Sequence, residues 1–200
     1  MDDDVLTSRL ALRRLTAADA EDLLCLDGDP EVMRYIDSKL KTLEQVRAEV
    51  LPRLAGGQAC WPGFGYWAAE TRAARQFIGW FGMRPVTPSA AAMVHWAKGG
   101  PEQPSVVELG YRLRRSVWGR GYATEGARVL ITAAFADPRV REVVATTMAV
   151  NAGSRRVMEK AGLRLARTVV VDWDDPLDGS EHGEVEYRLL RDDWTATSCR

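Results

Sequence analysis

The chain has 200 residues, of which 46% are hydrophobic and 28% charged, and its formal net charge at pH 7 is −1. These totals indicate one globular domain over residues 1–200 and exclude binding to nucleic acid or to an anionic membrane through overall charge. The three cysteines lie far apart, and the N-terminus has neither the basic nor the apolar region of a signal peptide. We therefore expect a cytoplasmic protein without a disulfide framework, a metal site or a transmembrane helix.

The N-terminal part of the chain is predicted to form one strand followed by helices. The strand covers residues 9–14, and the helices cover 16–26, 29–36 and 42–54. Thr16 and Thr42 stand where an N-cap hydroxyl would accept free backbone N–H groups of the first turn. Pro52 should disturb the end of the third helix, because proline lacks an N–H and its ring crowds the preceding turn.

The remainder of the chain is predicted to contain both strands and helices. Two aromatic-rich strands, 65–71 and 75–84, are separated by the short segment RAA, which suits a hairpin. Residues 85–104 are rich in proline, glycine and alanine, and we expect a long loop there. The later elements are expected in the order strand 105–115, helix 121–136, strand 142–149, helix 152–161, strand 163–172 and strand 184–191. A strand, a helix and a second strand with short connections imply a parallel pair and a right-handed crossover.

The stretch SVWGRGYATEGA, residues 116–127, places three glycines where a strand ends and a helix begins. A plain turn is one interpretation of these glycines. A phosphate cradle is the other, because the first turn of a helix has unpaired N–H groups and a dipole that favours an anion. Glycine allows close approach of the backbone to that anion and permits a positive φ. Five arginines against one glutamate between positions 112 and 128 favour the phosphate cradle.

Two common nucleotide-binding motifs do not fit this loop. No run in the chain matches the P-loop pattern G-x-x-x-x-G-K-[ST]. A dinucleotide fingerprint beginning at Gly119 would need its third glycine at Thr124, and its acidic partner should end the next strand, whereas Glu142 begins it. A Rossmann-like NAD protein is therefore only a third alternative.

Two segments, WGRGYATEGA (118–127) and VNAGSRRVMEKAGL (150–163), together resemble the Gcn5-related N-acetyltransferase (GNAT) family. The resemblance is closest to the branch that contains the ribosomal-protein acetyltransferases RimJ and RimL. The family's loop pattern, Q/R-x-x-G-x-G/A, falls on Trp118, Gly121 and Ala123, and Trp118 departs from the usual glutamine or arginine. The resemblance implies a single α/β (α+β) domain with a mixed, mostly antiparallel central sheet, a splayed parallel strand pair and helices on both faces.

The resemblance also implies that acetyl-CoA is the co-substrate and that no metal takes part. Its pyrophosphate would be held by backbone N–H groups of the loop and the first helical turn, at Trp118, Gly119, Arg120, Gly121, Tyr122, Ala123 and Thr124. The pantetheine arm would lie between strands 105–115 and 142–149, bonded to Tyr111 and Leu113 through their backbone groups. Asn151 would bond the arm, a role compatible with capping a helix, and Ser154 would lie near the sulfur. Gly110 is either the bulge that opens this cleft or a packing glycine.

The implied chemistry is attack of a primary amine on a thioester, which needs a proton acceptor and a group that protonates the departing sulfur. Glu108 is the candidate base, directly or through water, and its alternative interpretation is a solvent-facing strand residue. Ser154 is the candidate acid. Tyr187 could also supply a hydroxyl, but its place in EVEYRLL suits strand packing better.

The acceptor site is expected to have an apolar wall and an acidic rim. Tyr35, Trp67 and Trp173 are the candidate wall residues, and residues 172–186 hold seven acids without a lysine or arginine. Such a rim would attract an amine, although a solvated hairpin loop explains the same composition. The expected reaction is direct acetyl transfer to a protein N-terminus or a small-molecule amine in a ternary complex. The alternative is a non-catalytic acyl-CoA-binding sensor or interaction module, and a homodimer is expected from the exposed edge strands.

Overall fold

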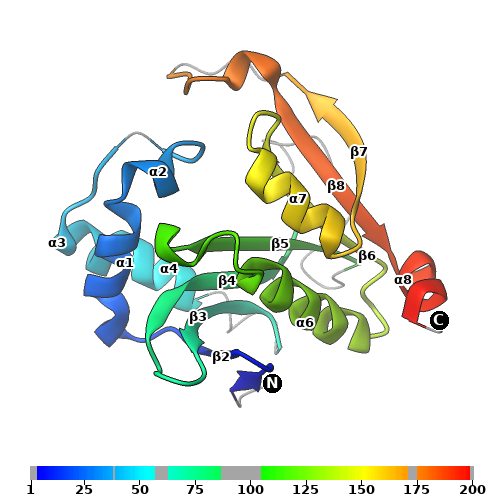
Figure 1. Cartoon of the computed structure of the whole chain (residues 1–200), viewed down its shortest axis with the longest axis horizontal. Helices are drawn as coiled ribbons and strands as arrows, with labels where there is room; N and C mark the ends of the chain where they lie inside the picture. Colours follow the sequence, from blue (N-terminus) through cyan, green and yellow to red (C-terminus); the bar gives the residue numbers. More distant parts are fainter. Residues whose placement is uncertain (1–3, 38, 57–62, 87–104, 171–174, 199–200) are drawn as a thin grey trace. The chain divides into compact units, whose positions relative to one another are not determined.

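The structure is a computed structural model that describes residues 4–37, 39–56, 63–86, 105–170 and 175–198 (Figure 1). Trp173 and residues 87–104 of the expected long loop lie outside the described residues. The chain divides into two compact units, Met1–Gly82 with Gly110–Gly126, and Met83–Leu109 with Ala127–Arg200.

Eight strands are hydrogen-bonded in the order β1-β2-β3-β4-β5-β6-β8-β7. They are β1 Val5–Leu6, β2 Leu10–Arg14, β3 Gly65–Thr71, β4 Phe77–Pro85, β5 Val106–Leu113, β6 Glu142–Met148, β7 Arg164–Val169 and β8 Glu184–Leu190. β5 and β6 run parallel, with Val106 opposite Glu142 and Glu108 opposite Val144. The pairs β1–β2, β2–β3, β6–β8 and β7–β8 are antiparallel. The expected mixed sheet with a parallel pair is confirmed.

The first unit packs short helices over its strands. They are the 3-10 turn η1 Ala17–Asp19, then α1 Ala20–Asp27, α2 Pro30–Met33, α3 Leu43–Gln45 and α4 Leu51–Gly56. Their apolar side chains form one buried cluster that includes Leu23, Leu26, Val46, Leu54 and the β4 residue Phe77. The spacing of these apolar positions places them on the buried side of each helix.

The helix predicted over residues 42–54 is present, and it is irregular directly before Pro52, as expected. Its start agrees, because the Thr42 hydroxyl accepts the Gln45 N–H at 3.2 Å and the Gln45 side chain accepts the Thr42 N–H at 2.8 Å. Pro52 does not end the helix, which continues to Gly56 after a wide turn over Val46–Val50. In that turn the Leu51 N–H donates to the Val46 carbonyl, five residues back. The wider turn gives room for the proline ring that follows.

The second unit contains the N-terminal half of β5 together with β6, β8 and β7. Helix α7 (Ala152–Lys160) lies against these strands, as Figure 1 shows, and contacts β6 and β7. The C-terminal helix α8 (Arg191–Ser198) was not expected. Arg191 at its start donates to the carbonyls of Phe135 at 2.9 Å and Val140 at 2.7 Å, and also to that of Asp137.

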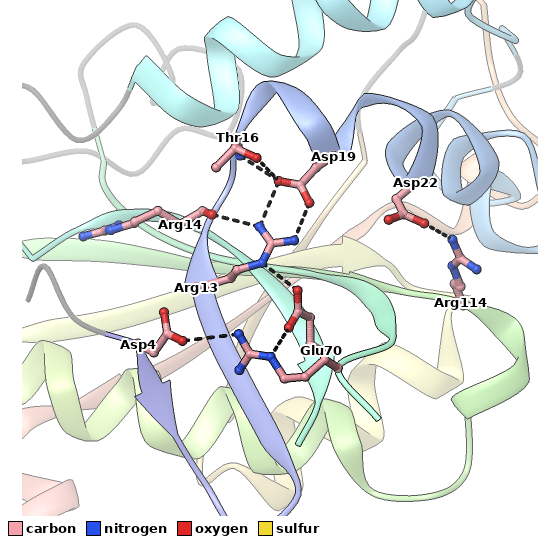
Figure 2. A network of polar contacts seen from close by, with 9 residues as sticks. Asp4, Arg13, Arg14, Thr16, Asp19, Asp22, Glu70 and Arg114 are labelled. Carbon is pink, nitrogen blue, oxygen red and sulfur yellow. Dashed lines mark hydrogen bonds and ion pairs between the residues drawn. The ribbon is translucent and has the colours of Figure 1, made fainter. Parts of the chain in front are cut away.

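A buried charge cluster joins β2, η1 and β3 in the first unit (Figure 2). The Arg13 guanidinium bonds both oxygens of Asp19, at 2.6 and 2.9 Å, and reaches Glu70 at 2.6 Å. Asp19 is only 2% exposed. It also accepts the Thr16 N–H at 2.7 Å, so the turn predicted to be capped by the Thr16 hydroxyl is held chiefly by a carboxylate. Burial raises the pKa of Asp19, but the bonds from Arg13 and Thr16 outweigh it and lower the pKa below its usual value.

Candidate active site

The glycine-rich loop leads into helix α6 (Tyr122–Ala136) with a backbone that favours glycine at two positions. Gly119 has φ 72° and Gly121 has φ 83°, both in the left-handed region. The first helical hydrogen bond runs from the Glu125 N–H to the Gly121 carbonyl at 3.0 Å. The N–H groups of Tyr122, Ala123 and Thr124 therefore have no acceptor within the helix. These N–H groups and the helix dipole are suited to an anion.

The third glycine has a different role, which is packing. A Cβ placed on Gly126 would lie 2.6 Å from Cε1 and Cε2 of Phe81, a distance that real Cβ atoms do not show. Gly126 therefore lets the first turns of α6 lie directly on the Phe81 ring of β4.

We expect Gly126→Ala to destabilise the protein by about 1–2 kcal/mol, because the overpacking cost exceeds the gain of about 1 kcal/mol in helix propensity. Gly153→Ala in α7 is the matched control, since a Cβ there meets only the Asn151 Oδ1 at 3.7 Å. The control should leave stability unchanged or raise it. Urea unfolding of both variants measures the difference, and equal effects would contradict the packing role of Gly126.

Trp118 connects the start of the loop to the end of β5. It follows the 3-10 turn η3 (Arg115–Val117), and its indole Nε1 donates to the Leu113 carbonyl at 2.8 Å. Leu113 is a residue whose backbone is expected to bond the cofactor arm. Its carbonyl oxygen already accepts this hydrogen bond from Trp118. The hydrogen bond fixes the Nε1 edge of the indole. Trp118 is 47% exposed, so much of the remaining ring is accessible to solvent.

The arginines near the loop contribute less positive charge to it than the sequence indicated. Arg112 forms an ion pair with Asp27, and Arg114 pairs with Asp22 at 2.6 Å. Arg128 donates to the Lys160 carbonyl at 2.6 and 3.1 Å. Arg115, Arg120 and Arg128 are the three of the five that are exposed. Acids neutralise two of the five arginines, so the charge argument for an anion rests on the other three.

Glu125, on the first turn of α6, is bound by the residues that precede β2. Its Oε1 accepts from the Thr7 hydroxyl at 2.6 Å, the Ser8 hydroxyl at 2.9 Å and the Arg9 N–H at 2.9 Å. Its Oε2 accepts from the Arg9 guanidinium at 2.6 Å. Burial alone would raise the pKa of Glu125, but these hydrogen bonds outweigh burial and lower the pKa to about 2.

We expect the protein to lose stability as the pH falls from about 4.5 towards 2. The pKa of Glu125 falls from 4.5 to about 2 on folding, so its contribution is complete above pH 4.5 and is lost on acidification. The lowered pKa of Asp19 acts in the same direction. Urea unfolding at pH 7, 4 and 3 measures this loss, and Glu125→Gln should reduce its size. A pH dependence unchanged in that variant would contradict the assignment.

In the second unit, Asn151 caps helix α7, as the capping interpretation predicts. Its Oδ1 accepts the Ser154 N–H at 3.1 Å, and its Nδ2 donates to the Thr147 hydroxyl of β6 at 3.0 Å. The turn from β6 to α7 is thereby held from both sides. Ser154 lies in the first turn of α7 and is half-buried.

Glu108, the candidate base, lies in β5 opposite Val144 of β6 and is half-buried. Its Oε2 forms an ion pair with Arg84. The two interpretations of Glu108, a general base and a solvent-facing strand residue, both remain predictions. The sequence did not point to Arg84.

Tyr187 belongs to the packed interior of the second unit, as the sequence favoured. Its hydroxyl donates to Glu159 at 2.8 Å and accepts from the Arg155 guanidinium at 3.2 Å. Burial, the largest influence, raises its pKa above the usual value. These contacts fix the hydroxyl between α7 and β8.

The candidate acceptor residues differ in exposure. Trp67 is 1% exposed, and the Arg14 guanidinium lies over its ring, 4.4 Å from the centroid. Tyr35 is half-buried, with Arg34 5.3 Å from its ring centroid. Trp173 lies outside the described residues.

The acidic rim predicted over 172–186 is smaller than its sequence indicates. Glu184 and Glu186 belong to strand β8. Glu186 is 2% exposed and paired with Arg167 at 2.7 Å and with Arg188, so its charge is neutralised. Burial raises the pKa of Glu184.

Gly110 does not need to be glycine for packing. A Cβ there would meet the Trp80 ring at 3.6 Å, which is an ordinary contact. The bulge interpretation of Gly110 remains a prediction.

Comparison with protein families matches residues 9–164 to the Acetyltransferase (GNAT) domain. The chain belongs to the GNAT acetyltransferase family. The chain is 34% identical over 193 residues to the FsC-acetyl coenzyme A-N(2)-transacetylase of Aspergillus fumigatus. The matched region covers 94% of this chain and 76% of that relative. An uncharacterised Bacillus subtilis protein, YkkB, is 31% identical over 86% of this chain and 91% of its own length.

Solved structures show the same GNAT fold. RimL, the ribosomal L7/L12 alpha-N-protein acetyltransferase, superposes with a TM-score of 0.73 at 16% identity, covering 94% of this chain and 98% of RimL. The aminoglycoside acetyltransferase AAC(6')-Ib, solved with coenzyme A, superposes with a TM-score of 0.69 at 20% identity, covering 94% and 99% of the two chains.

This GNAT acetyltransferase has its candidate site residues in both units. Tyr111, Leu113 and the loop residues Trp118–Thr124 belong to the first unit, and Glu108, Asn151 and Ser154 belong to the second. Within the described ranges, no three His, Cys, Asp or Glu side chains group as metal ligands. No helix among the same residues is long and apolar enough to span a membrane.

Proposed function

We propose that this GNAT acetyltransferase transfers the acetyl group of acetyl-CoA to a primary amine of a small molecule. The observation that carries the proposal is the 34% identity, over 94% of the chain, to a protein named as an acetyl coenzyme A-N(2)-transacetylase. The positive-φ glycine loop at the start of α6 supports it independently, because that backbone is suited to a pyrophosphate.

The loop would bind the cofactor through its backbone. The N–H groups of Trp118–Thr124 would donate to the pyrophosphate, with Arg115 and Arg120 as the exposed cations beside them. Since Trp118 takes the place of the usual glutamine or arginine and its indole N–H is used by Leu113, the backbone carries most of this binding.

The pantetheine arm would be bound by residues that follow the resemblance to the family. Backbone groups of Tyr111 and Leu113 and the side chain of Asn151 are its proposed partners. The Oδ1 of Asn151 already caps α7, but each amide nitrogen has two protons and one is bonded to Thr147. The second proton is the group that we assign to the arm.

Acetyl transfer would proceed by direct attack of the amine nitrogen on the thioester carbonyl carbon. The new C–N bond forms as the C–S bond breaks, and the electron pair of that bond leaves with the CoA sulfur. Glu108, directly or through water, takes the proton that the amine loses, and Ser154 supplies a proton to the sulfur. Tyr187 is not assigned this role, because its hydroxyl donates to Glu159.

A protein N-terminus is the second candidate acceptor. The segment WGRGYATEGA resembles the RimJ and RimL branch, whose members act on ribosomal proteins. Tyr35 and Trp173 are the proposed wall of the acceptor site in either case, whereas Trp67, which is 1% exposed and covered by Arg14, is a core residue.

An acceptor panel tests the proposal. The purified protein is incubated with acetyl-CoA and, separately, with aminoglycosides, polyamines, free amino acids and ribosomal-type N-terminal peptides, and the free CoA thiol is measured against a blank without acceptor. Turnover with a small amine supports the proposal, and turnover with peptides alone replaces it by the second candidate. Acetyl-CoA binding without turnover on any acceptor favours the non-catalytic sensor.

A further inference from the structure

We propose that Arg9 and Glu125 are positioning residues that set the anion-binding conformation of the glycine loop. This inference rests on the proposed function, because it assigns the loop to the pyrophosphate of acetyl-CoA. Arg9 is far from its partners in the sequence. It lies 116 positions before Glu125 and 111 positions before Arg120, whose carbonyl it binds.

Arg9 contacts the glycine loop at its backbone and also contacts the first side chain of helix α6. Its Nη1 donates to the Arg120 carbonyl at 2.8 Å. Its guanidinium carbon lies 4.7 Å from the centroid of the Tyr122 ring, which is a cation–π distance. A Cβ placed on Gly121, between these two residues, would lie 3.3 Å from the Arg9 Nη2.

The bond to the Arg120 carbonyl fixes the direction of a neighbouring N–H. The peptide between Arg120 and Gly121 is planar and trans, so its C=O and its N–H point in opposite directions. When Arg9 draws the carbonyl towards itself, the Gly121 N–H faces away from Arg9 and out of the loop. Without that bond, the glycines on either side of Arg120 would allow this peptide to rotate.

Glu125 fixes Arg9 in turn. Its carboxylate accepts from the Arg9 backbone N–H at 2.9 Å and from the Arg9 guanidinium at 2.6 Å, and the hydroxyls of Thr7 and Ser8 complete its coordination. Since the charge of Arg9 is neutralised by Glu125, Arg9 acts on the loop by position rather than by attracting the anion. A residue of this kind changes the affinity for the pyrophosphate and leaves the chemical step unchanged.

The test compares two donors, acetyl-CoA and acetyl-pantetheine, of which the second lacks the pyrophosphate. The variants are Arg9→Met, Arg9→Lys and Glu125→Gln. Arg72→Met is the matched control, because Arg72 bonds the Thr7 carbonyl of the same segment at 3.0 Å. Steady-state kinetics are measured with both donors, and thermal unfolding is measured for every variant.

We expect Arg9→Met to raise KM for acetyl-CoA about tenfold, with kcat within about twofold and with acetyl-pantetheine kinetics unchanged. Glu125→Gln should have a smaller effect of the same kind, and Arg9→Lys should lie between Arg9→Met and the wild type. Arg72→Met should lower the melting temperature without separating the two donors. Equal effects on both donors, or lower melting temperatures with an unchanged KM for acetyl-CoA, would overturn the inference.

Failure of the proposed function gives a different result. If the wild type turns over neither donor, calorimetry with CoA and with pantetheine replaces kinetics. Weaker CoA binding by Arg9→Met with unchanged pantetheine binding would still support the positioning role, and unchanged CoA binding would reject it.

Discussion

Replacing Arg13 by methionine is expected to lower the free energy of unfolding by about 3–5 kcal/mol, which is the cost of breaking a buried ion pair by removing one partner. The guanidinium of Arg13 is shared by Asp19 and Glu70, and Asp19 is 2% exposed. Without Arg13, the Asp19 carboxylate retains only Thr16 as a polar partner among the residues that the structure describes. Urea unfolding at pH 7 measures the loss.

Arg75→Met is the matched control for Arg13→Met. Arg75 binds the same Glu70 at 2.9 Å, but its side chain is 52% exposed, so its removal should cost less than about 1 kcal/mol. Arg13→Met combined with Asp19→Asn should cost less than the sum of the two single changes, because the second change removes the charge left unpaired by the first. Additive losses would contradict the buried pair as the cause.

Glu108→Gln is expected to reduce kcat/KM for the amine by about 10²–10⁴, the usual contribution of a positioned general base. Glutamine retains the shape of glutamate but cannot accept the amine proton. Glu108→Asp keeps a carboxylate at a shorter reach and should retain part of the activity. The measurement is initial rates of CoA thiol release at saturating acetyl-CoA.

Glu31→Gln controls for a change of net charge, because Glu31 is an exposed glutamate at the start of α2. It should leave the rate unchanged. Wild-type rates in Glu108→Gln, with acetyl-CoA binding intact, would remove Glu108 from the mechanism.

The order and type of the longer elements could be predicted from the sequence because each has a clear period. Val107, Leu109 and Leu113 alternate along β5 and are all buried, and α6 repeats small and apolar residues at helical spacing. The parallel pairing of β5 with β6 followed from the short connections around α6. The short strand β1 was missed because two residues show no period, and helix α8 was missed because its sequence, RDDWTATS, has too few apolar residues to show one.

The glycine loop was predicted in its backbone but not in its surroundings. Positive φ at Gly119 and Gly121 followed from the residue type and the strand-to-helix position. The partners of Arg112 and Arg114 are acids of α1, far away in the sequence, so local charge counting overstated the positive charge of the loop. The role of Arg9 depends on tertiary pairing with α6, which no local pattern reveals.

The most direct test of acetyl transfer is the stoichiometry of the reaction. The purified protein, acetyl-CoA and each amine acceptor are incubated together, and the free CoA thiol and the acetylated amine are quantified in the same sample by thiol titration and mass spectrometry. We predict one acetylated amine for each thiol released, and no thiol above the blank when the acceptor is left out. Thiol release that is independent of any amine, or acetyl-CoA binding with no acetylated product from any acceptor, would contradict an amine acetyltransferase.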